Sequence, residues 1–384
     1  MKRIVFAMSD TGGGHRAAAD AISEALKRLY GEANLDIKLV DIFKHYCYFP
    51  LNTMPDFYPL HVKYSKGSYG MTFNMTNTRR RARILSKGMF KTNQLKLKRL
   101  PIDYPADTVV SVHSILTRPT FDAYRRYSDQ NPALLTVVTD LISTHYLWYD
   151  KRTDVTMVPT EIAYDRGIEA GLDADQLLLT GLPVNPSFLD AIEDVDKSTI
   201  RADLKWDPNL PAILMVAGGD GMGTIYETAR AVDARKLKCQ LIIIAGKNDK
   251  LKEKLESASW NQPTLIYPFI RNMPQLMLAA DILVTKAGPA TICEAMIAGL
   301  PIIISDLIPG QEEGNVDFVI QNEAGVFAPK PRLVADALEE WLSNGADTMH
   351  RLTQNAHACA KPDAVWEIAR QIGHSLQLEP LNQA

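Results

Sequence analysis

The sequence lacks any apolar run long enough to cross a bilayer. A transmembrane helix needs about 20 consecutive apolar residues, and no segment of this 384-residue chain approaches that length. The N-terminus has the pattern of a charged strand rather than that of a signal peptide. We therefore expect the protein to fold in the cytoplasm.

Cysteine is scarce, and no two cysteines have the C-x-x-C spacing. The four cysteines are scattered along the chain: Cys47, Cys239, Cys293 and Cys359. Free thiols fit this pattern better than a disulfide framework or a zinc site. We expect free, buried thiols.

Acidic residues are absent between Asp56 and Asp103, although the chain as a whole has a net charge of -3. This segment, residues 57–102, is called the basic block below. Its basic residues are Lys63, Lys66, Arg79, Arg80, Arg81, Arg83, Lys87, Lys91, Lys96, Lys98 and Arg99. Aromatic and methionine residues lie between them, a pattern typical of a protein that rests on an anionic bilayer. Nucleic-acid binding and a solvated helix face are the alternatives, and we favour the bilayer.

The length predicts two domains, because one hydrophobic core rarely serves a chain of this size. Strand and helix signals alternate, which predicts an α/β fold with two parallel sheets built from βαβ units. We expect domains at 1–186 and 211–347, a polar, proline-bracketed linker at 187–210, and a helical tail at 348–384 that packs back across the linker. The expected strands are 3–8, 36–42, 107–112, 133–139, 154–158, 177–180, 212–217, 239–245, 264–268, 281–285, 301–305 and 325–327.

A glycine-rich turn joins the first strand to the first helix. It reads Ser9-Asp10-Thr11-Gly12-Gly13-Gly14-His15. Glycines such as Gly13 and Gly14 let backbone N–H groups approach an anion at the positive end of a helix dipole. The turn therefore indicates a phosphate-binding site, the alternative being a tight turn with a solvated histidine.

A second glycine-rich turn follows the apolar run at 212–217. It reads Gly218-Gly219-Asp220-Gly221-Met222-Gly223, a spacing that differs from the dinucleotide fingerprint G-x-G-x-x-G. Two such turns about two hundred residues apart in corresponding places predict two similar domains that face a shared cleft.

Two clusters in the second half can bind a nucleotide sugar. The turn at 285–291 joins a strand to a helix that carries Glu294, so its amides could hold a diphosphate while the carboxylate accepts hydrogen bonds from a ribose. Gly310-Gln311-Glu312-Glu313-Gly314-Asn315 offers carboxylate and amide groups suited to sugar hydroxyls. Such residues are also ordinary at helix starts.

In the first half, Asp140 ends a strand, and His145 and Trp148 follow it closely. An Asp at a strand's carboxyl end is a candidate catalytic base or a group that orients one. A simple turn cap is an equally good interpretation of Asp140.

Taken together and in order, these motifs resemble a known family: monogalactosyldiacylglycerol synthases and the related processive diacylglycerol glucosyltransferases. The resemblance runs from the first strand to about residue 345, and the second half is more distantly similar to the lipid II-forming N-acetylglucosaminyltransferase. It rests on the turns described above and on Asn52-Thr53-Met54-Pro55, Pro159-Thr160-Glu161, Gly181-Leu182-Pro183 and Lys286-Ala287-Gly288-Pro289. It implies the GT-B fold, in which two Rossmann-like domains hold the acceptor lipid and the nucleotide sugar, respectively.

The resemblance also implies roles for individual residues. His15 or Asp140 would be the catalytic base. Acceptor and membrane contacts would come from Met54, Pro55, Arg79, Arg80, Arg81, Arg83, His145 and Trp148. Donor contacts would come from Gly13, Gly14, Gly219, Gly221, Phe269, Ile270, Lys286, Ala287, Gly288, Pro289, Ala290, Thr291, Glu294, Gln311, Glu312 and Asn315. Two positions depart from the family pattern: Ala290 replaces a common glycine, and His113 lacks the proline that usually follows it.

The implied reaction transfers galactose or glucose from a UDP-sugar to diacylglycerol with inversion and without a metal or other cofactor. The implied partners are anionic membrane lipids rather than nucleic acid, and the implied location is the inner face of the membrane, with peripheral attachment. Three alternatives remain. A nucleotide-sugar epimerase would not need the basic block. A nicotinamide oxidoreductase would need the spacing G-x-G-x-x-G. A non-catalytic lipid- or nucleic-acid-binding protein would not explain Glu294. A transferase acting on another lipid or soluble acceptor is a further alternative.

Overall fold

The computed structural model describes residues 1–57, 65–193, 196–216 and 224–381, and these residues form two compact units. The first unit comprises residues 1–186, 308–311 and 361–384, and the second comprises 187–307 and 312–360. Each unit contains one six-stranded sheet. All strand pairs in both sheets are parallel.

The first sheet has the strand order β2-β1-β3-β4-β5-β6. Its strands are β1 (Lys2–Met8), β2 (Leu35–Asp41), β3 (Thr108–Ser111), β4 (Ala133–Val137), β5 (Val155–Val158) and β6 (Leu177–Leu179). The central strands read as almost continuous apolar or β-branched runs, because helices cover a parallel sheet on both faces. Since β1 lies between β2 and β3, the chain reverses its direction of winding at the boundary between β1 and β3.

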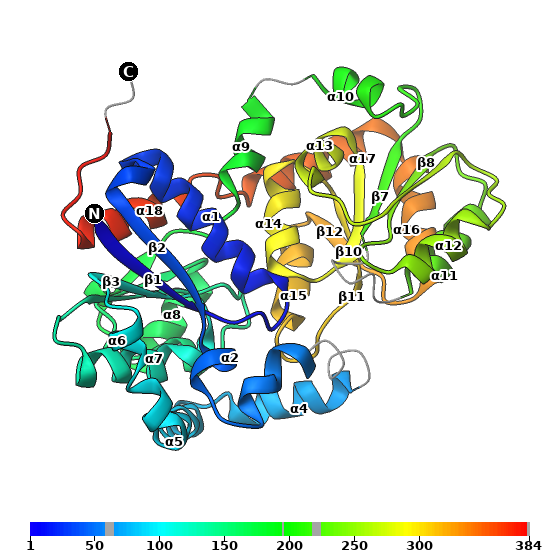
Figure 1. Ribbon diagram of the computed structural model, residues 1–384. Coiled ribbons are helices and arrows are strands. Elements are labelled where there is room, and N and C mark those ends of the chain that lie inside the picture. The colour runs from blue at the N-terminus through cyan, green and yellow to red at the C-terminus, as the bar shows by residue number, and fades with distance from the viewer. Residues whose placement is uncertain (58–64, 194–195, 217–223, 382–384) are drawn as a thin grey trace. The chain divides into compact units, whose positions relative to one another are not determined.

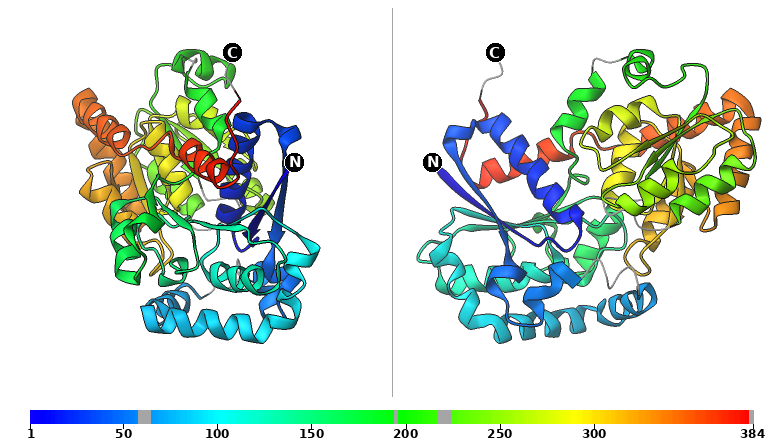
Figure 2. Two further views of the ribbon diagram at one scale, coloured as in Figure 1. Left: turned by 90° about the vertical axis from the view of Figure 1, so that its left-hand side faces the viewer. Right: turned by 45° about the vertical axis from the view of Figure 1, so that its right-hand side comes forward.

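Helices cover both faces of the first sheet (Figures 1 and 2). The views show α1 and α18 over one face and α5, α6 and α7 over the other, and Phe90, Leu97 and Phe121 pack there with strand residues in one buried cluster. The helices of this unit are α1 (Gly13–Tyr30), η1 (Glu32–Asn34), α2 (Ile42–Tyr46), η2 (Leu51–Thr53), α4 (Lys66–Thr76), α5 (Arg79–Leu97), α6 (Leu100–Asp103), α7 (Ser114–Tyr127), η3 (Tyr146–Trp148), α8 (Glu161–Ala170), η4 (Ala174–Gln176) and α18 (Ala364–Ser375).

The C-terminal helix α18 belongs to the first unit because it packs on α1. Gly373 lies directly against the Tyr30 ring, where no Cβ would fit. The hydroxyl groups of Thr108 and Ser375 lie 3.0 Å apart, which ties the helix to the start of β3.

The second sheet has the strand order β12-β11-β10-β7-β8-β9. Its strands are β7 (Ala212–Val216), β8 (Gln240–Ile244), β9 (Thr264–Tyr267), β10 (Ile282–Lys286), β11 (Ile302–Asp306) and β12 (Gly325–Phe327). Here the winding reverses between β7 and β10. Parallel open sheets bind their ligands at this kind of switch point, outside the carboxyl ends of the strands.

Helices also cover both faces of the second sheet. In Figure 1, α11, α12 and α16 lie on one side of it and α13 and α14 on the other. The helices of this unit, which begins at Ser187 within α9, are α9 (Pro186–Glu193), α10 (Lys197–Asp203), α11 (Ile225–Asp233), α12 (Asp249–Glu256), α13 (Met273–Ala279), α14 (Pro289–Ile297), α15 (Glu313–Gln321), α16 (Pro331–Ser343) and α17 (Gly345–Ala358).

The sequence predicted this fold class correctly, and each of the twelve expected strands overlaps an observed one. The segment expected to be a linker, 187–210, contains most of α9 and all of α10. The segment expected to be the tail begins within α17, in the second unit, and ends with α18, in the first. None of the helices in the described part of the chain is both long and apolar enough to span a membrane.

Candidate functional site

Two histidines lie at the switch point of the first sheet. His15 is in the first turn of α1, after β1, and His113 follows β3 and caps α7. Since β1 and β3 are neighbours in the sheet, the two rings meet with their centroids 4.3 Å apart. Sequence reasoning named His113 only for the proline that does not follow it and gave it no role in the site. Its position directly after a buried strand, like that of the glycine-rich turn, is the signal that could have indicated one.

Backbone and side-chain groups hold the His15 ring in one orientation. Its Nδ1 lies 2.8 Å from the Val112 carbonyl oxygen and 3.0 Å from Thr139 Oγ1. A carbonyl oxygen can only accept a hydrogen bond, so Nδ1 carries the proton and Nε2 of the neutral ring carries the lone pair. Nε2 is therefore the nitrogen of this ring that can accept a proton.

Burial lowers the pKa of His15 from its usual value, while the Asp140 carboxylate and the Val112 carbonyl oppose that shift. The pKa of His113 is held well below its usual value, first by burial and then by the neighbouring His15. His15 is thus neutral at pH 7, as a proton acceptor must be.

The start of α1 is open around its glycines. Gly12 precedes the helix with a φ of 77°, no side chain caps the helix, and its first turn has no acidic residue. A Cβ added at Gly13 or Gly14 would have no atom of the described residues within 4 Å. The amides of this 18-residue helix are therefore accessible to a ligand.

Asp140 is buried and has a partner on each carboxylate oxygen. Trp148 Nε1 donates to Oδ2 at 2.7 Å, and Gln311 Nε2 donates to Oδ1 at 2.9 Å. No hydrogen bond joins Asp140 to His15 in the described part of the chain, so Val112 and Thr139 orient the His15 ring. Asp140 influences His15 through its charge alone.

Both ring nitrogens of His145 have a hydrogen-bond partner. Its Nδ1 accepts from the Leu147 N–H at 3.0 Å, and its Nε2 lies 3.1 Å from Thr76 Oγ1. Burial is the main cause that lowers the pKa of His145 to about 4. This neutral ring connects α4 to η3, so the structure gives it a supporting position.

The remaining residues predicted for acceptor or membrane contact lie on the first unit. Met54 packs against the buried cluster that contains Phe90, and Pro55 next to it is half-buried. Four arginines open α5 and are all exposed: Arg79, Arg80, Arg81 and Arg83.

In the second unit, the turn after β10 leads into α14 at the switch point between β10 and β7. Gly288 is the N-cap residue, Pro289 opens the helix, and no side chain caps it. The amides of Ala290 and Thr291 have no intrahelical partner at this position and none elsewhere in the described segments. Open donors at the positive end of a helix are able to bind an anion.

Neighbouring residues hold this turn in place. Lys286 Nζ pairs with the buried Glu312 carboxylate at 2.7 Å. Asn315 Nδ2 donates to the Ala287 carbonyl oxygen at 2.9 Å. The structure therefore brings Glu312 and Asn315 together with the turn, whereas Gln311 belongs to the first unit, where the Tyr69 hydroxyl also donates to it at 2.8 Å.

Glu294 lies in the second turn of α14, and its carboxylate has no hydrogen-bond or ion-pair partner among the described residues. Burial raises its pKa to about 7. An unpaired carboxyl group in such surroundings is costly, and it suits a ligand that brings hydroxyl donors.

Phe269 and Ile270 follow β9, two strands away from β7 in the same sheet. Phe269 is exposed, and Lys247 Nζ lies 5.2 Å from its ring centroid. Gly219 and Gly221 lie outside the described residues.

Two family profiles together cover most of the chain. The profile "Monogalactosyldiacylglycerol (MGDG) synthase" matches residues 15–184, and "Glycosyltransferase family 28 C-terminal domain" matches residues 213–369.

Solved structures with low sequence identity share the fold. MurG of Acinetobacter baumannii has a TM-score of 0.62 at 15% identity, with 97% of this chain and 100% of that chain covered. The S. aureus MnaA-UDP co-structure has a TM-score of 0.63 at 17% identity, with 98% of each chain covered.

Closer relatives come from plants. The probable monogalactosyldiacylglycerol synthase 2 of Oryza sativa subsp. japonica is 36% identical over 389 residues, which cover 99% of this chain and 81% of the relative. Monogalactosyldiacylglycerol synthase 3 of Arabidopsis thaliana is 35% identical, with 98% of this chain and 82% of the relative covered. This chain belongs to the monogalactosyldiacylglycerol synthase family.

Proposed function

We propose that the protein transfers a hexose from a UDP-sugar to the free hydroxyl of diacylglycerol, with inversion, to form a β-glycosyl-diacylglycerol. Membership of the family over nearly the whole chain supports this function. The observation that carries the mechanism is the neutral His15 ring, whose Nδ1 is fixed on Val112 and whose Nε2 is left as the base.

In the proposed reaction, His15 Nε2 takes the proton of the acceptor hydroxyl as its oxygen attacks the anomeric carbon of the sugar. The bond from that carbon to the diphosphate oxygen breaks, and UDP leaves with the electron pair. General base catalysis of this kind contributes about 10²- to 10⁴-fold to the rate. Asp140 stabilises the protonated ring through its charge.

For the donor, we propose that the open amides of Ala290 and Thr291 bind the diphosphate at the start of α14. The positive end of the helix and Lys286 would then stabilise the leaving UDP without a metal ion. Glu294 would accept hydrogen bonds from the ribose, and Phe269 with Ile270 would contact the base. Gly219 and Gly221 remain proposed donor contacts, as do Gln311, Glu312 and Asn315 for the sugar.

The hexose is proposed to be galactose, because the plant relatives are named as monogalactosyldiacylglycerol synthases. The acceptor is proposed to reach the protein from the cytoplasmic face of a membrane. Exposed apolar side chains on α4 and α5 support this surface, since they accompany the basic residues of the basic block: Met71, Met75, Ile84, Leu85 and Leu95.

A transfer assay tests the function. Vesicles that contain diacylglycerol are incubated with UDP-galactose or UDP-glucose, separately, with and without a metal chelator, and the lipid products are identified by mass spectrometry and by the proton coupling of the anomeric centre. We expect β-galactosyl-diacylglycerol from UDP-galactose in both buffers. A change in the UDP-sugar without any glycolipid would instead indicate an epimerase, and an α-linked product would contradict inversion.

A further inference from the structure

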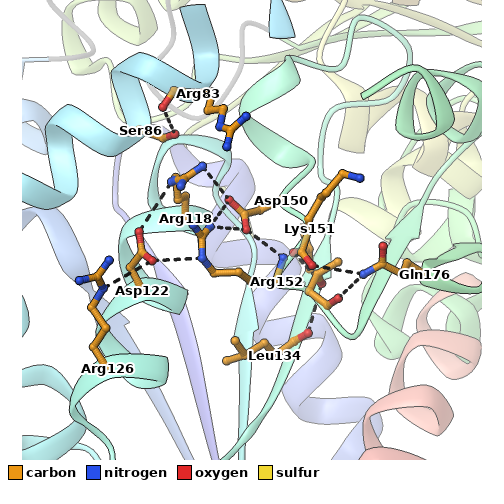
Figure 3. Close-up of polar contacts among 12 residues, drawn as sticks. Arg83, Ser86, Arg118, Asp122, Arg126, Leu134, Asp150, Lys151, Arg152 and Gln176 are labelled. Carbon is orange, nitrogen blue, oxygen red and sulfur yellow. Dashed lines mark hydrogen bonds and ion pairs between the residues drawn. The ribbon is translucent and has the colours of Figure 1, made fainter. Parts of the chain in front are cut away.

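A basic cavity lies in the first unit, and the reaction proposed above does not use it. It has a volume of about 230 Å³ and lies between α5, α7 and the segment from η3 to β5. Figure 3 shows Arg83 on one side of this space and Arg118 with Lys151 and Arg152 on the other. The volume is below the range typical of pockets for drug-sized ligands, so the cavity suits a small group.

One face of α5 forms a wall of the cavity. Arg79, Ala82, Arg83 and Ser86 line it, and their spacing of three and four residues places them on the same side of the helix. Ala82 and Ser86 are small, so the two arginines are the only long side chains that this face of α5 contributes to the lining.

Positive charge exceeds negative charge in this cavity. Five cationic side chains line it, against one lining carboxylate, that of Asp150, and a second one beside it, that of Asp122. Arg152 makes the short contacts with both carboxylates. Its Nη1 donates to the Asp150 oxygens at 2.6 and 2.7 Å, and its Nε lies 3.1 Å from Asp122.

Arg118 lies among these charged groups but makes only long contacts with the two carboxylates. Its Nε and Nη1 lie 3.6 Å from Asp122 and Asp150, respectively, and its Nε is a buried donor without a hydrogen bond in the described part of the chain. A buried charged donor without a partner is costly. Burial, followed by the cations Arg152 and Arg83, lowers the pKa of Arg118, and the two carboxylates only partly oppose this.

The side chains of Arg83 and Lys151 have no ion-pair partner among the described residues. Lys151 comes from the loop before β5, and Arg83 from α5. Guanidinium groups match the oxygens of a phosphate in pairs, and an ammonium group adds a compact charge. A phosphate would therefore supply what the cluster lacks: negative charge and several acceptor oxygens.

We propose that this cavity is a binding site for a phosphate group, held by Arg83, Arg118 and Lys151 with Arg152 behind them. The group could belong to a lipid head or to a free phosphate, since both present the same oxygens. The site is in the first unit, whereas the residues proposed to hold the UDP diphosphate are in the second.

The test measures phosphate binding to the full chain by isothermal titration calorimetry, with saturating UDP present so that the donor site is filled. Ionic strength is held constant with chloride. We expect saturable binding that Arg83→Gln weakens at least about tenfold, as loss of a charged hydrogen bond implies. Arg80→Gln is the matched control, because Arg80 is exposed on the same helix but does not line the cavity, and it should leave the phosphate affinity within about twofold of wild type.

Two further measurements distinguish a lipid phosphate from a free phosphate and check that a variant is folded. Phosphatidylcholine vesicles with and without a lipid phosphomonoester are compared with inorganic phosphate and glycerol 3-phosphate, and competition between lipid and free phosphate shows which one binds more tightly. Arg118→Lys keeps the positive charge but loses the paired N–H donors of the guanidinium group. The unfolding temperature of this variant is measured without and with phosphate. Absence of phosphate binding to wild type, or equal losses in Arg83→Gln and Arg80→Gln, would overturn the proposal. Neither result bears on hexose transfer, which is assayed separately.

Discussion

The rings of His15 and His113 lie 4.3 Å apart at the point where the first sheet changes its winding. Thr11 Oγ1 lies 2.9 Å from His113 Nε2, and His113 Nδ1 is buried without a hydrogen-bond partner among the described residues. A proton on one ring raises the cost of a proton on the other. Of the pair, we propose that His15 Nε2 takes the proton of the acceptor lipid's hydroxyl group.

Replacement of His15 by Ala is expected to lower turnover by about a hundredfold or more, because it removes the proposed general base. UDP affinity, measured by calorimetry, should stay close to wild type, since the donor is proposed to bind to the other unit. His374→Ala is the control, because His374 is exposed on α18. Near-normal turnover of His15→Ala at saturating acceptor would assign the base role to Asp140 or to another group.

The rate should depend on pH through the protonation of His15. Burial places its pKa below the usual value, so the neutral form is the main one at pH 7 and activity should fall as the pH drops below about 6.5. The profile of kcat/KM is measured from pH 5 to 8. A rise that continues well above pH 7 would contradict a lowered His15 pKa.

Stability should depend on pH through His145. Its pKa is about 4 in the folded protein and about 6.5 in the unfolded chain, so the unfolded chain takes up the proton first as the pH falls. The free energy of unfolding should therefore decrease as the pH falls from about 6.5 toward 4, by about 2 to 3 kcal/mol for this group. His145→Asn should be less stable at pH 7.5 and lose less stability in acid, as denaturant titrations at several pH values can measure. An equal slope in both proteins would show that other groups cause the dependence.

The sequence predicted the strands because buried parallel strands read as runs of β-branched and aliphatic residues, as in β7 and β8. It could not predict partners that lie far apart in the chain. Gln311 and Glu312 are adjacent in one motif, yet Gln311 bonds Asp140 in the first unit and Glu312 pairs with Lys286 in the second. The cavity around Arg118 likewise joins residues from four separate segments, so no local pattern could reveal it.

Glu294 should link UDP binding to pH. Its pKa is about 7 in the free protein, and a ribose diol would stabilise the ionised carboxylate, so UDP binding should become tighter as the pH rises from 6 to 8. Calorimetry in buffers of different ionisation enthalpy should detect proton release below pH 7.

The matched variants for this residue are Glu294→Gln and Glu294→Ala. Glu294→Gln should weaken UDP binding and remove this residue's share of the proton release, while Glu294→Ala should weaken binding further and change kcat less than KM. Unchanged UDP affinity in a folded Ala variant would remove Glu294 from the donor site.

The basic block should bind the protein to anionic bilayers. Replacement of Arg79, Arg80, Arg81 and Arg83 by Ser should reduce cosedimentation with vesicles that contain anionic lipid and reduce activity on lipid, while UDP affinity stays unchanged. Each of these charges contributes about 1 kcal/mol near an anionic surface, and salt screens the attraction over about 8 Å at physiological ionic strength. Binding should therefore weaken as salt rises.

The control for this surface is a variant with four exposed basic residues of the second unit replaced by Ser: Lys236, Lys238, Lys330 and Arg332. It removes the same charge from the protein, so a general electrostatic effect would weaken both variants equally. A specific surface on α5 predicts loss only in the first variant, and the exposed Ile84 and Leu85 beside its arginines predict some residual binding at high salt through apolar insertion. Equal binding of wild type to neutral and anionic vesicles would mean that the arginines face water and that the acceptor reaches His15 from another surface.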